Sequence, residues 1–279
     1  MARMSTPSPW TAPETTAVLK VPTDGDDKYS RGVVGMRTGS EEFPGAAVLG
    51  VEAAWRTGVG MVRYLGPRRA ADLVLQRRPE TVTAEGRVQA WVVGSGTSSA
   101  TRTPAETAAV RTILTGGVPV VVDAGALDLV VAASALTGDC APLVLTPHDR
   151  EHAALRERLG LAASSDRERA ALETAAVTGA VLLLKGATTL IATPSGTLRS
   201  VTAGVAWLAA AGTGDVLAGI LGALLAGAPD RPADAAAGAA WLHGRAGAAA
   251  SARHAGGPVV ALDVADAVAA VVGELVSER

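Results

Sequence analysis

The chain has a single cysteine, Cys140, among 279 residues, so it can form no internal disulfide framework. Aromatic residues make up only 3% of the sequence, which leaves few rings on which nucleic-acid bases could stack. The formal net charge is −2, which argues against a basic surface for nucleic acid. These shortages disfavour a disulfide-stapled secreted scaffold and a nucleic-acid-binding protein, and we expect no nucleic-acid partner.

Long apolar runs are also scarce. The N-terminus carries prolines and charges but no apolar core of a signal peptide. The one run that approaches the roughly 18 apolar residues of a membrane span lies in residues 209–228. Its GTGD start and glycine-rich body are more typical of a buried helix. We therefore predict a cytoplasmic protein with no membrane partner.

Apolar material is plentiful, since hydrophobic residues make up 48% of the chain and charged residues 19%. Residues 1–27 are rich in proline, threonine and aspartate, and we predict a flexible N-terminal lead there. Residues 28–279 contain no internal repeat and no linker, so we expect them to form a single domain.

Strand-like and helix-like patterns alternate along this domain. Fully apolar strands that alternate with helices predict an α/β fold, with a mostly parallel sheet and helices on both faces. The expected strands are 33–36, 61–65, 91–93, 119–122, 143–145 and 181–184, followed by a hairpin of 189–192 and 198–202. The expected helices are 46–55, 104–114, 150–159, 167–177, 209–228, 233–252 and 262–272.

The central helix has the sequence AAAGTGDVLAGILGALLAGA over residues 209–228. It is apolar on every side, which is typical of a helix inside the core rather than on the surface. We expect Thr213 to be its N-cap, and Gly227 with Pro229 to end it.

The GTGD turn at the start of this helix suggests a binding site. Gly212 and Gly214 allow the backbone to approach a ligand closely, and free amides at a helix N-terminus bind anions such as phosphate. A carboxylate beside such an anion is unusual, because the two repel each other. The placement of Asp215 makes sense if it accepts a proton or steers a nucleophile. The alternative, which the stretch alone leaves open, is that Asp215 only caps the helix and the glycines only serve packing.

Polar or glycine-rich sequences follow directly after several expected strands. In a parallel sheet the carboxyl ends of the strands meet at one edge, and ligands bind there. The sequences in question are Gly94-Ser95-Gly96, Asp123, His148 and Lys185-Gly186. We therefore expect them to converge on one crevice.

Each of these pieces also has a plainer interpretation. Gly94 and Gly96 could form only a strand-to-helix turn. Asp123 could hold a substrate or a hydrated cation, or only close an Asx turn. Lys185 could face phosphates, or lie in solvent at a tight turn. Taken one at a time, these pieces leave the alternatives open.

The segment from His148 to His152 reads H-x-x-E-H, which on a helix is the pattern of an inverted zinc-peptidase site. His148 follows Pro147 and an expected strand, so we expect it in the turn before the helix. No third ligand is marked in the sequence. A zinc peptidase is therefore kept as a remote alternative, and we expect no zinc at these histidines.

Together, these motifs resemble the ADP-dependent NAD(P)H-hydrate dehydratase family, a branch of the ribokinase-like fold. The resemblance spans residues 28–275 in the order KYSRG, GSEEFPGAAVLG, GSG, VVVDAGAL, LTPH-x-x-E, LLLKGATTLIATPSG, AAAGTGDVLAGILGALLAG and AAWLHGRAG. The chain departs from the family at TPHDRE, where the family usually has TPHPGE. It also has Val205-Ala206 in place of a common Asn-Pro.

The resemblance implies roles for individual residues. The residues that would contact a hydrated nicotinamide substrate are Ala46, Gly96, His148 and Asp215, with Asp215 as the catalytic base. The residues that would contact an adenine nucleotide are Lys185, Gly186, Ala187, Thr188, Thr189 and Gly214. No protein ligand to a metal is implied.

The implied reaction removes water from hydrated NADH or NADPH, with ADP or ATP as co-substrate and Mg²⁺ on the phosphates. Hydroxide is a poor leaving group, so the hydroxyl would be phosphorylated and phosphate would then leave. The resemblance also implies a homo-oligomer, with a tetramer as one candidate, and a separate epimerase in the same pathway. The rival hypotheses are a ribokinase-like vitamin or sugar kinase, and a nucleotide-binding regulatory protein that has lost its chemistry.

Overall fold

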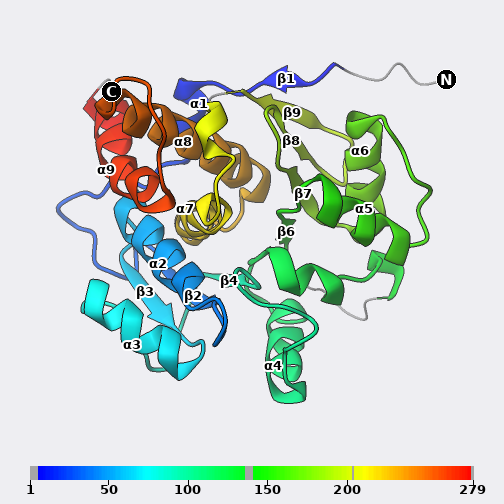
Figure 1. Ribbon diagram of the computed structural model, residues 1–279, viewed down its shortest axis with the longest axis horizontal. Coiled ribbons are helices and arrows are strands. Elements are labelled where there is room, and N and C mark those ends of the chain that lie inside the picture. Colours follow the sequence, from blue (N-terminus) through cyan, green and yellow to red (C-terminus); the bar gives the residue numbers. More distant parts are fainter. Residues whose placement is uncertain (1–5, 136–140, 203, 278–279) are drawn as a thin grey trace.

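The computed structural model describes residues 6–135, 141–202 and 204–277, and Cys140 lies outside these ranges. Within them, one sheet of nine strands has the order β1-β9-β8-β7-β6-β5-β4-β2-β3 (Figure 1). The strands are β1 (Ser8–Pro9), β2 (Val33–Arg37), β3 (Met61–Tyr64), β4 (Ala90–Val93), β5 (Val120–Val122), β6 (Leu143–Leu145), β7 (Val181–Leu184), β8 (Thr189–Ala192) and β9 (Leu198–Val201).

Neighbouring strands are parallel except at the hairpin, where β7–β8 and β8–β9 pair antiparallel. The α-helices are α1 (Ala12–Val18), α2 (Gly45–Thr57), α3 (Arg68–Arg77), α4 (Pro104–Leu114), α5 (Asp149–Arg158), α6 (Arg167–Thr178), α7 (Thr213–Gly227), α8 (Pro232–Arg253) and α9 (Ala261–Ser277). Helices α4, α5 and α6 lie on one side of the sheet, and α2, α7, α8 and α9 lie on the other (Figure 1). The predicted α/β class, with a mostly parallel sheet covered on both faces, is confirmed.

Helix α7 lies at the centre of the larger core, where it packs against the sheet and against α2, α8 and α9. Nearly all of its side chains are buried, and it ends at Gly227 as predicted. The prediction of its N-cap was wrong. Gly212 is the N-cap, with a left-handed φ of 87°, and Thr213 is already helical. The Thr213 hydroxyl instead donates hydrogen bonds to the carbonyls of Leu208 and Ala210, and so ties the preceding loop to the helix.

The N-terminal segment differs from the flexible lead that was predicted for residues 1–27. Strand β1 pairs in parallel with β9, and α1 packs on α8. Trp10 and Val18 are buried in the larger core, and the Trp10 indole donates to the hydroxyl of Thr15. Two buried apolar side chains and a ladder partner therefore fix a segment whose composition alone suggested disorder.

Helix α3 was not predicted, because its sequence RRAADLVLQR is mostly polar and buries only Ala70 and Val74. The helices and strands that were predicted are all present, with ends that differ by a few residues. No helix in the described ranges is both long and apolar enough to cross a membrane.

A cluster of ion pairs around a buried carboxylate links helices α2, α3 and α9. Glu52 of α2 is fully buried, and Arg56, Arg77 and Arg78 all form ion pairs with it. Arg56 and Arg77 also pair with Asp266 of α9. Burial acts to raise the pKa of Glu52, but the hydrogen bonds from Arg78 and Arg56 outweigh it and lower the pKa to about 2.

We expect Glu52→Gln to destabilise the fold by about 3–5 kcal/mol, because it leaves several cations around a neutral side chain in a buried site. The free energy of unfolding from urea titration measures this. The folded-state pKa is depressed from its ordinary value of 4.5 to about 2. The stabilisation is therefore present above about pH 4.5 and is lost as the pH falls toward 2.

Asp72→Asn is the matched control, since Asp72 forms an exposed ion pair with Arg68 one helical turn away. Such pairs contribute about 0–1 kcal/mol. Equal losses in the two variants would contradict a special role for Glu52.

Candidate active site

The carboxyl ends of the central strands meet at a buried ion pair. Asp123 follows β5, and Lys185 follows β7 two strands away. The Lys185 Nζ donates a hydrogen bond to Asp123 Oδ1 at 2.9 Å, and the two side chains are 19% and 4% exposed. The alternative in which Lys185 lies in solvent is therefore wrong.

Hydroxyl groups from the two flanking strands complete the hydrogen bonding of this carboxylate. Thr146, directly after β6, donates to Asp123 Oδ1 at 2.8 Å, and Ser95, after β4, donates to Oδ2 at 2.9 Å. The Asp123 side chain accepts no backbone amide at the 3₁₀ helix that follows (Ala124–Leu129), so the Asx-turn alternative is wrong as well. Four neighbouring strand ends are thus joined through one carboxylate.

A second carboxylate approaches the lysine from helix α5. Glu151 Oε2 lies 3.8 Å from Lys185 Nζ and accepts the backbone amide of His148 at 2.8 Å. His148 is the N-cap of α5, as expected from its place in the turn. Its Nδ1 accepts the amides of Arg150 and Glu151, which assigns the proton of a neutral imidazole to Nε2. The half-exposed His148 ring therefore presents a donor at the rim of the site.

The first turn of α7 lies beside this pair. A methyl group built on Gly214 would lie 3.6 Å from Lys185 Nζ, so the GTGD turn and the lysine are neighbours. Among the backbone hydrogen bonds of the described residues, the amides of Gly214 and Asp215 donate none. A helix N-terminus with free amides and a nearby ammonium group is suited to bind a phosphate.

The Asp215 carboxylate is half-buried in this turn, and no hydrogen bond or ion pair between described residues uses it. Burial raises its pKa, the negative charge of Asp123 raises it further, and the positive charge of Lys185 opposes both. The result is a pKa of about 7. At neutral pH a carboxyl of this pKa is an effective proton acceptor. A side chain that caps no amide also does not fit the capping alternative.

The lysine remains charged in spite of its burial. Burial acts to lower the pKa of Lys185, but the carboxylates of Asp123 and Glu151 outweigh it and the net pKa is raised. The carboxylates of Asp123, Glu151 and Asp215 therefore all act on one ammonium group.

The expected substrate residues on the other side of the site also come together. Gly96 has a φ of +66°, and a methyl group on it would collide with the side chain of Ala46 in the first turn of α2. One turn further along α2, a methyl on Gly50 would lie 3.4 Å from the carbonyl oxygen of Asp215. Helix α2 therefore contacts both Gly96, through Ala46, and the first turn of α7, through Gly50.

Four of the expected nucleotide residues, Lys185, Gly186, Ala187 and Thr188, form the loop that joins β7 to β8, and a fifth, Thr189, begins β8. Arg167 of α6 holds its backbone, donating to the carbonyls of Lys185 at 3.0 Å and Thr188 at 3.1 Å. A methyl group built on Gly186 would lie 2.6 Å from the Arg167 guanidinium, so a side chain there would displace this arginine. Lys185, the first residue after β7, thus lies next to Gly214 of α7.

His243 of α8 is a site residue that the sequence did not reveal. Its Nε2 is buried and has no hydrogen-bond partner within the described residues. Burial lowers the pKa of His243 to about 4, a backbone hydrogen bond at Thr213 opposes this, and the charge of Lys185 adds to the lowering. The ring is therefore neutral at pH 7. The only sequence signal was its position in the AAWLHGRAG segment.

The geometry does not support the zinc-peptidase alternative. His152 is buried between α5 and α6, where its Nε2 lies 2.9 Å from the hydroxyl of Thr174, whereas His148 caps α5 at the rim of the crevice. Within the described parts of the chain, no three His, Cys, Asp or Glu side chains are grouped to hold a metal.

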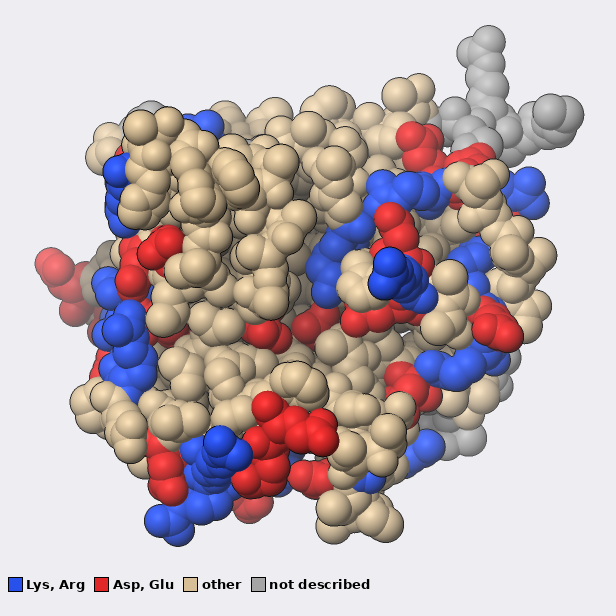
Figure 2. Space-filling view, viewed as in Figure 1, with Lys and Arg blue, Asp and Glu red and all other residues tan. Residues whose placement is uncertain are grey.

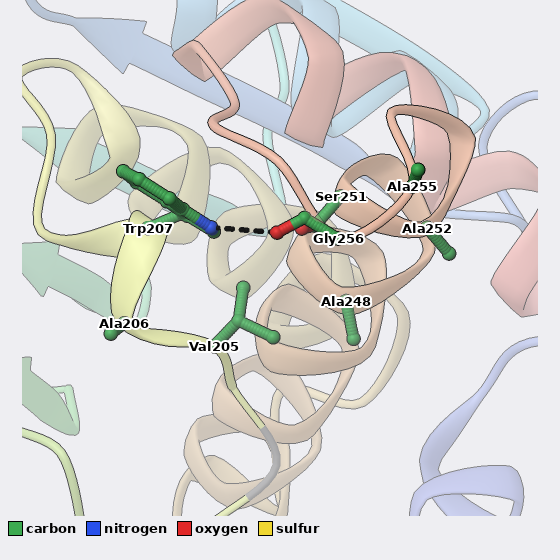
Figure 3. Close-up of a pocket in the computed structure, with 8 residues that line it drawn as sticks. All are labelled: Val205, Ala206, Trp207, Ala248, Ser251, Ala252, Ala255 and Gly256. Atoms are coloured by element: carbon green, nitrogen blue, oxygen red, sulfur yellow. Dashed lines mark hydrogen bonds between the residues drawn. The ribbon is translucent and has the colours of Figure 1, made fainter.

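Figure 2 shows this face of the molecule hollowed near its middle, with acidic atoms in the hollow and basic atoms beside it. A separate pocket of about 590 Å³ lies between the 3₁₀ turn Ala206–Leu208 and the end of α8 (Figure 3). Trp207 lines this pocket, and its indole N–H donates a hydrogen bond to the carbonyl of Gly256 at 2.9 Å. The residues that line this pocket carry no titratable side chain, so it offers no acid or base for catalysis.

Residues 34–269 match the family model described as NAD(P)H-hydrate dehydratase. A bifunctional NAD(P)H-hydrate repair enzyme of Mycobacterium leprae is 45% identical over 245 residues, which are 85% of this chain and 50% of that protein. The chain thus spans about half the length of the bifunctional relatives that it matches.

The ADP-dependent (S)-NAD(P)H-hydrate dehydratase of Neisseria meningitidis serogroup B is 35% identical, over 82% of this chain and 80% of that protein. Among solved structures, the ADP/ATP-dependent NAD(P)H-hydrate dehydratase of Bacillus subtilis, co-crystallised with ATP and Mg²⁺, superposes with a TM-score of 0.84 at 28% identity. That match covers 96% of this chain and 98% of the other. The ribokinase-like fold is confirmed, since a ribokinase-like superfamily protein of Enterococcus faecalis also superposes, with a TM-score of 0.81 at 20% identity.

We expect Asp123→Asn to lower the pKa of Asp215 from about 7 toward the ordinary value of 3.8. The change removes a negative charge that raises this pKa, and it leaves the positive charge of Lys185 less balanced. Titration of the Asp215 carboxyl by carbon-13 NMR measures the shift.

Ser95→Ala is the control, because it removes one hydrogen bond to Asp123 and keeps the charge. A thermal melt checks that both variants are folded. An Asp215 pKa that stays near 7 in folded Asp123→Asn would contradict the electrostatic account.

Proposed function

The chain belongs to the NAD(P)H-hydrate dehydratase family, and we propose that it removes water from hydrated NADH or NADPH at the expense of ADP or ATP. The observation that carries the proposal is the unpaired carboxylate of Asp215, with a pKa of about 7, beside free amides at the start of α7. A base next to an anion site is what transfer of a phosphoryl group to a substrate hydroxyl requires.

The proposed roles follow the two sides of Asp215. On one side, the turn from Lys185 to Thr189 would hold the adenine nucleotide, and Lys185 and the Gly214 amide would meet its phosphates. On the other side, Ala46 and Gly96 would hold the hydrated nicotinamide ring, with the Nε2 proton of His148 as a donor to it. Residues 28–279 would carry out this reaction as a single domain.

The chemistry has two steps. Asp215 takes the proton of the ring hydroxyl while the hydroxyl oxygen attacks the terminal phosphorus of ADP. The bond from that phosphorus to the bridging oxygen breaks, and AMP leaves. Phosphate then departs with the electrons of the ester's carbon–oxygen bond, and the neighbouring ring carbon gives up a proton to water, which restores the double bond. The ion pair of Asp123 and Lys185 would remain beside Asp215 during the first step and set the electrostatic environment of its carboxylate.

Mg²⁺ is the expected metal, and it would neutralise phosphate charge when bound. The described residues offer no preformed cluster of metal ligands, which fits a Mg²⁺ that arrives with the phosphates and keeps most of its waters.

The remaining expectations belong to the same proposal. A homo-oligomer, with a tetramer as one candidate, and a separate epimerase in the same pathway are predictions from the resemblance. A cytoplasmic location is a prediction from the sequence, which has few long apolar runs. The choice between ADP and ATP and between NADH hydrate and NADPH hydrate is part of the assay below.

We expect the purified protein to restore NADH absorbance from NADH hydrate when ADP or ATP and Mg²⁺ are present. Asp215→Asn should lower turnover by about two to four orders of magnitude, because the amide cannot accept a proton. The acidic limb of the turnover–pH profile of the parent should lie near pH 7, since the pKa of Asp215 is about 7 and only its deprotonated form is active.

Asp263→Asn is the matched control, because Asp263 is an acid in the first turn of α9 that caps the amide of Val260. It should change the melting temperature more than the turnover. If nucleotide is consumed while a vitamin or sugar is phosphorylated and no NADH appears, the protein is a ribokinase-like kinase instead.

A further inference from the structure

A single arginine ties the loop between β7 and β8 to two helices. Arg167 is the first residue of α6, and each of its three guanidinium nitrogens has a partner. Nη2 donates to the carbonyl of Lys185 at 3.0 Å, and Nη1 donates to the carbonyl of Thr188 at 3.1 Å. Nε donates to Oδ1 of Asp149, in the first turn of α5, at 2.9 Å. Both ends of the loop and the start of α5 therefore meet at one side chain.

The loop has few other backbone contacts that could hold it in place. We call residues 185–188 the nucleotide loop. The amide of Lys185 donates to the carbonyl of Pro147 at 2.9 Å. Of the residues that the structure describes, none accepts a hydrogen bond from the amides of residues 186–188. These amides are free to meet a ligand, and the course of the loop backbone depends on Arg167.

The carbonyls that Arg167 holds also fix where a loop amide points. The peptide bond between Lys185 and Gly186 is trans, and in a trans unit the C=O and the next N–H point in opposite directions. Because the Lys185 carbonyl points toward Arg167, the Gly186 amide points away from it. A side chain without the guanidinium would leave this peptide unit free to rotate, and the amide would lose its direction.

Asp149 orients the guanidinium. The side chains of Arg167 and Asp149 are 35% and 66% exposed, so their ion pair adds little to the stability of the fold. A guanidinium is a rigid planar fork, however, and the bond from Nε to Asp149 leaves both Nη groups facing the loop carbonyls. The effect of Asp149 is therefore on geometry, and it acts through Arg167.

We propose that Arg167 and Asp149 are positioning residues for the co-substrate nucleotide: Arg167 holds the nucleotide loop so that its free amides face the nucleotide, and Asp149 orients Arg167. The guanidinium acts through the loop backbone rather than by contact with a phosphate, because all three of its nitrogens are already engaged. This inference rests on the proposed function, and it names the residues that set the affinity of the site for ADP.

The test measures the Kd for ADP with Mg²⁺ by calorimetry, together with KM and kcat in the NADH hydrate assay. Arg167→Met keeps the aliphatic stem and removes every donor, so it should raise the Kd and the KM for ADP about tenfold or more. The kcat at saturating ADP and the KM for NADH hydrate should stay within about twofold, since a loss of uniform binding changes the KM alone. A purely structural role would not separate these quantities.

Arg167→Lys separates position from charge. Lysine keeps the positive charge, but its single ammonium group cannot bond two carbonyls and a carboxylate as the planar fork does. It should therefore bind ADP almost as weakly as Arg167→Met. Asp149→Asn should raise the Kd for ADP about threefold. It should add nothing in the Arg167→Met background, because it acts through that side chain.

The matched controls lie on the same helix. Arg169→Met removes a cation that pairs with Glu173, and Glu168→Gln removes an acid next to Arg167. Both should keep the Kd for ADP within about twofold of the parent, since exposed charges contribute little. A thermal melt checks that each variant is folded, and if Arg167→Met is not, Arg167→Lys and Asp149→Asn decide the inference.

Two results would overturn the inference. If Arg167→Lys binds ADP as tightly as the parent, charge alone matters and the loop needs no positioning. If Arg167→Met and Arg169→Met lose the same affinity, the loop contacts have no special role. A parent that binds ADP but removes no water refutes only the proposed function, and the Kd values still decide the inference. A parent that binds neither ADP nor ATP overturns both.

Discussion

The site depends on one buried pair of opposite charges, Asp123 and Lys185. Isolated, either charge would be costly to bury, but here each has the other as partner and the carboxylate also accepts two hydroxyls. Asp215 lies beside this pair, and no hydrogen bond or ion pair between described residues uses its carboxylate. Burial raises the pKa of Asp215, the charge of Asp123 raises it further, and the charge of Lys185 opposes both, which leaves it at about 7. A fully solvated aspartate at the same place would be a weaker base.

The parallel sheet explains why these groups meet. Strand ends that are distant in sequence become neighbours at one edge, and the expectation of a crevice there needed only the order of strands and helices. The apolar strands, the hairpin and the all-apolar helix α7 carry strong local patterns, and they could be predicted closely. The residues that follow each strand could be singled out for the same reason.

The partners within the site could not be predicted. Asp123 and Lys185 are 62 residues apart, and nothing local in either segment states that they bond. Ser95 and Thr146 look like ordinary hydroxyl residues after strands until the register places them beside one carboxylate. The prediction of the N-cap of α7 was wrong because the local sequence is the same whether the threonine hydroxyl caps the helix or hydrogen-bonds to the preceding loop. Helix α3 has only a narrow apolar face, made by Ala70, Ala71 and Val74, and ion pairs of Arg77 and Arg78 with Glu52 tie its end to α2.

The short strand β1 has a consequence for how molecules of this protein meet one another. It lies on the outer edge of β9, the strand that residues 193–197 join to β8. Arg199 of β9 stacks on Trp10 and pairs with Glu14, so the N-terminal segment is fastened to that edge by side chains as well as by the ladder. An uncovered edge is a template on which strands of other molecules can assemble. The N-terminal segment thus acts as a guard against aggregation through the sheet, although its composition resembles a disordered tail.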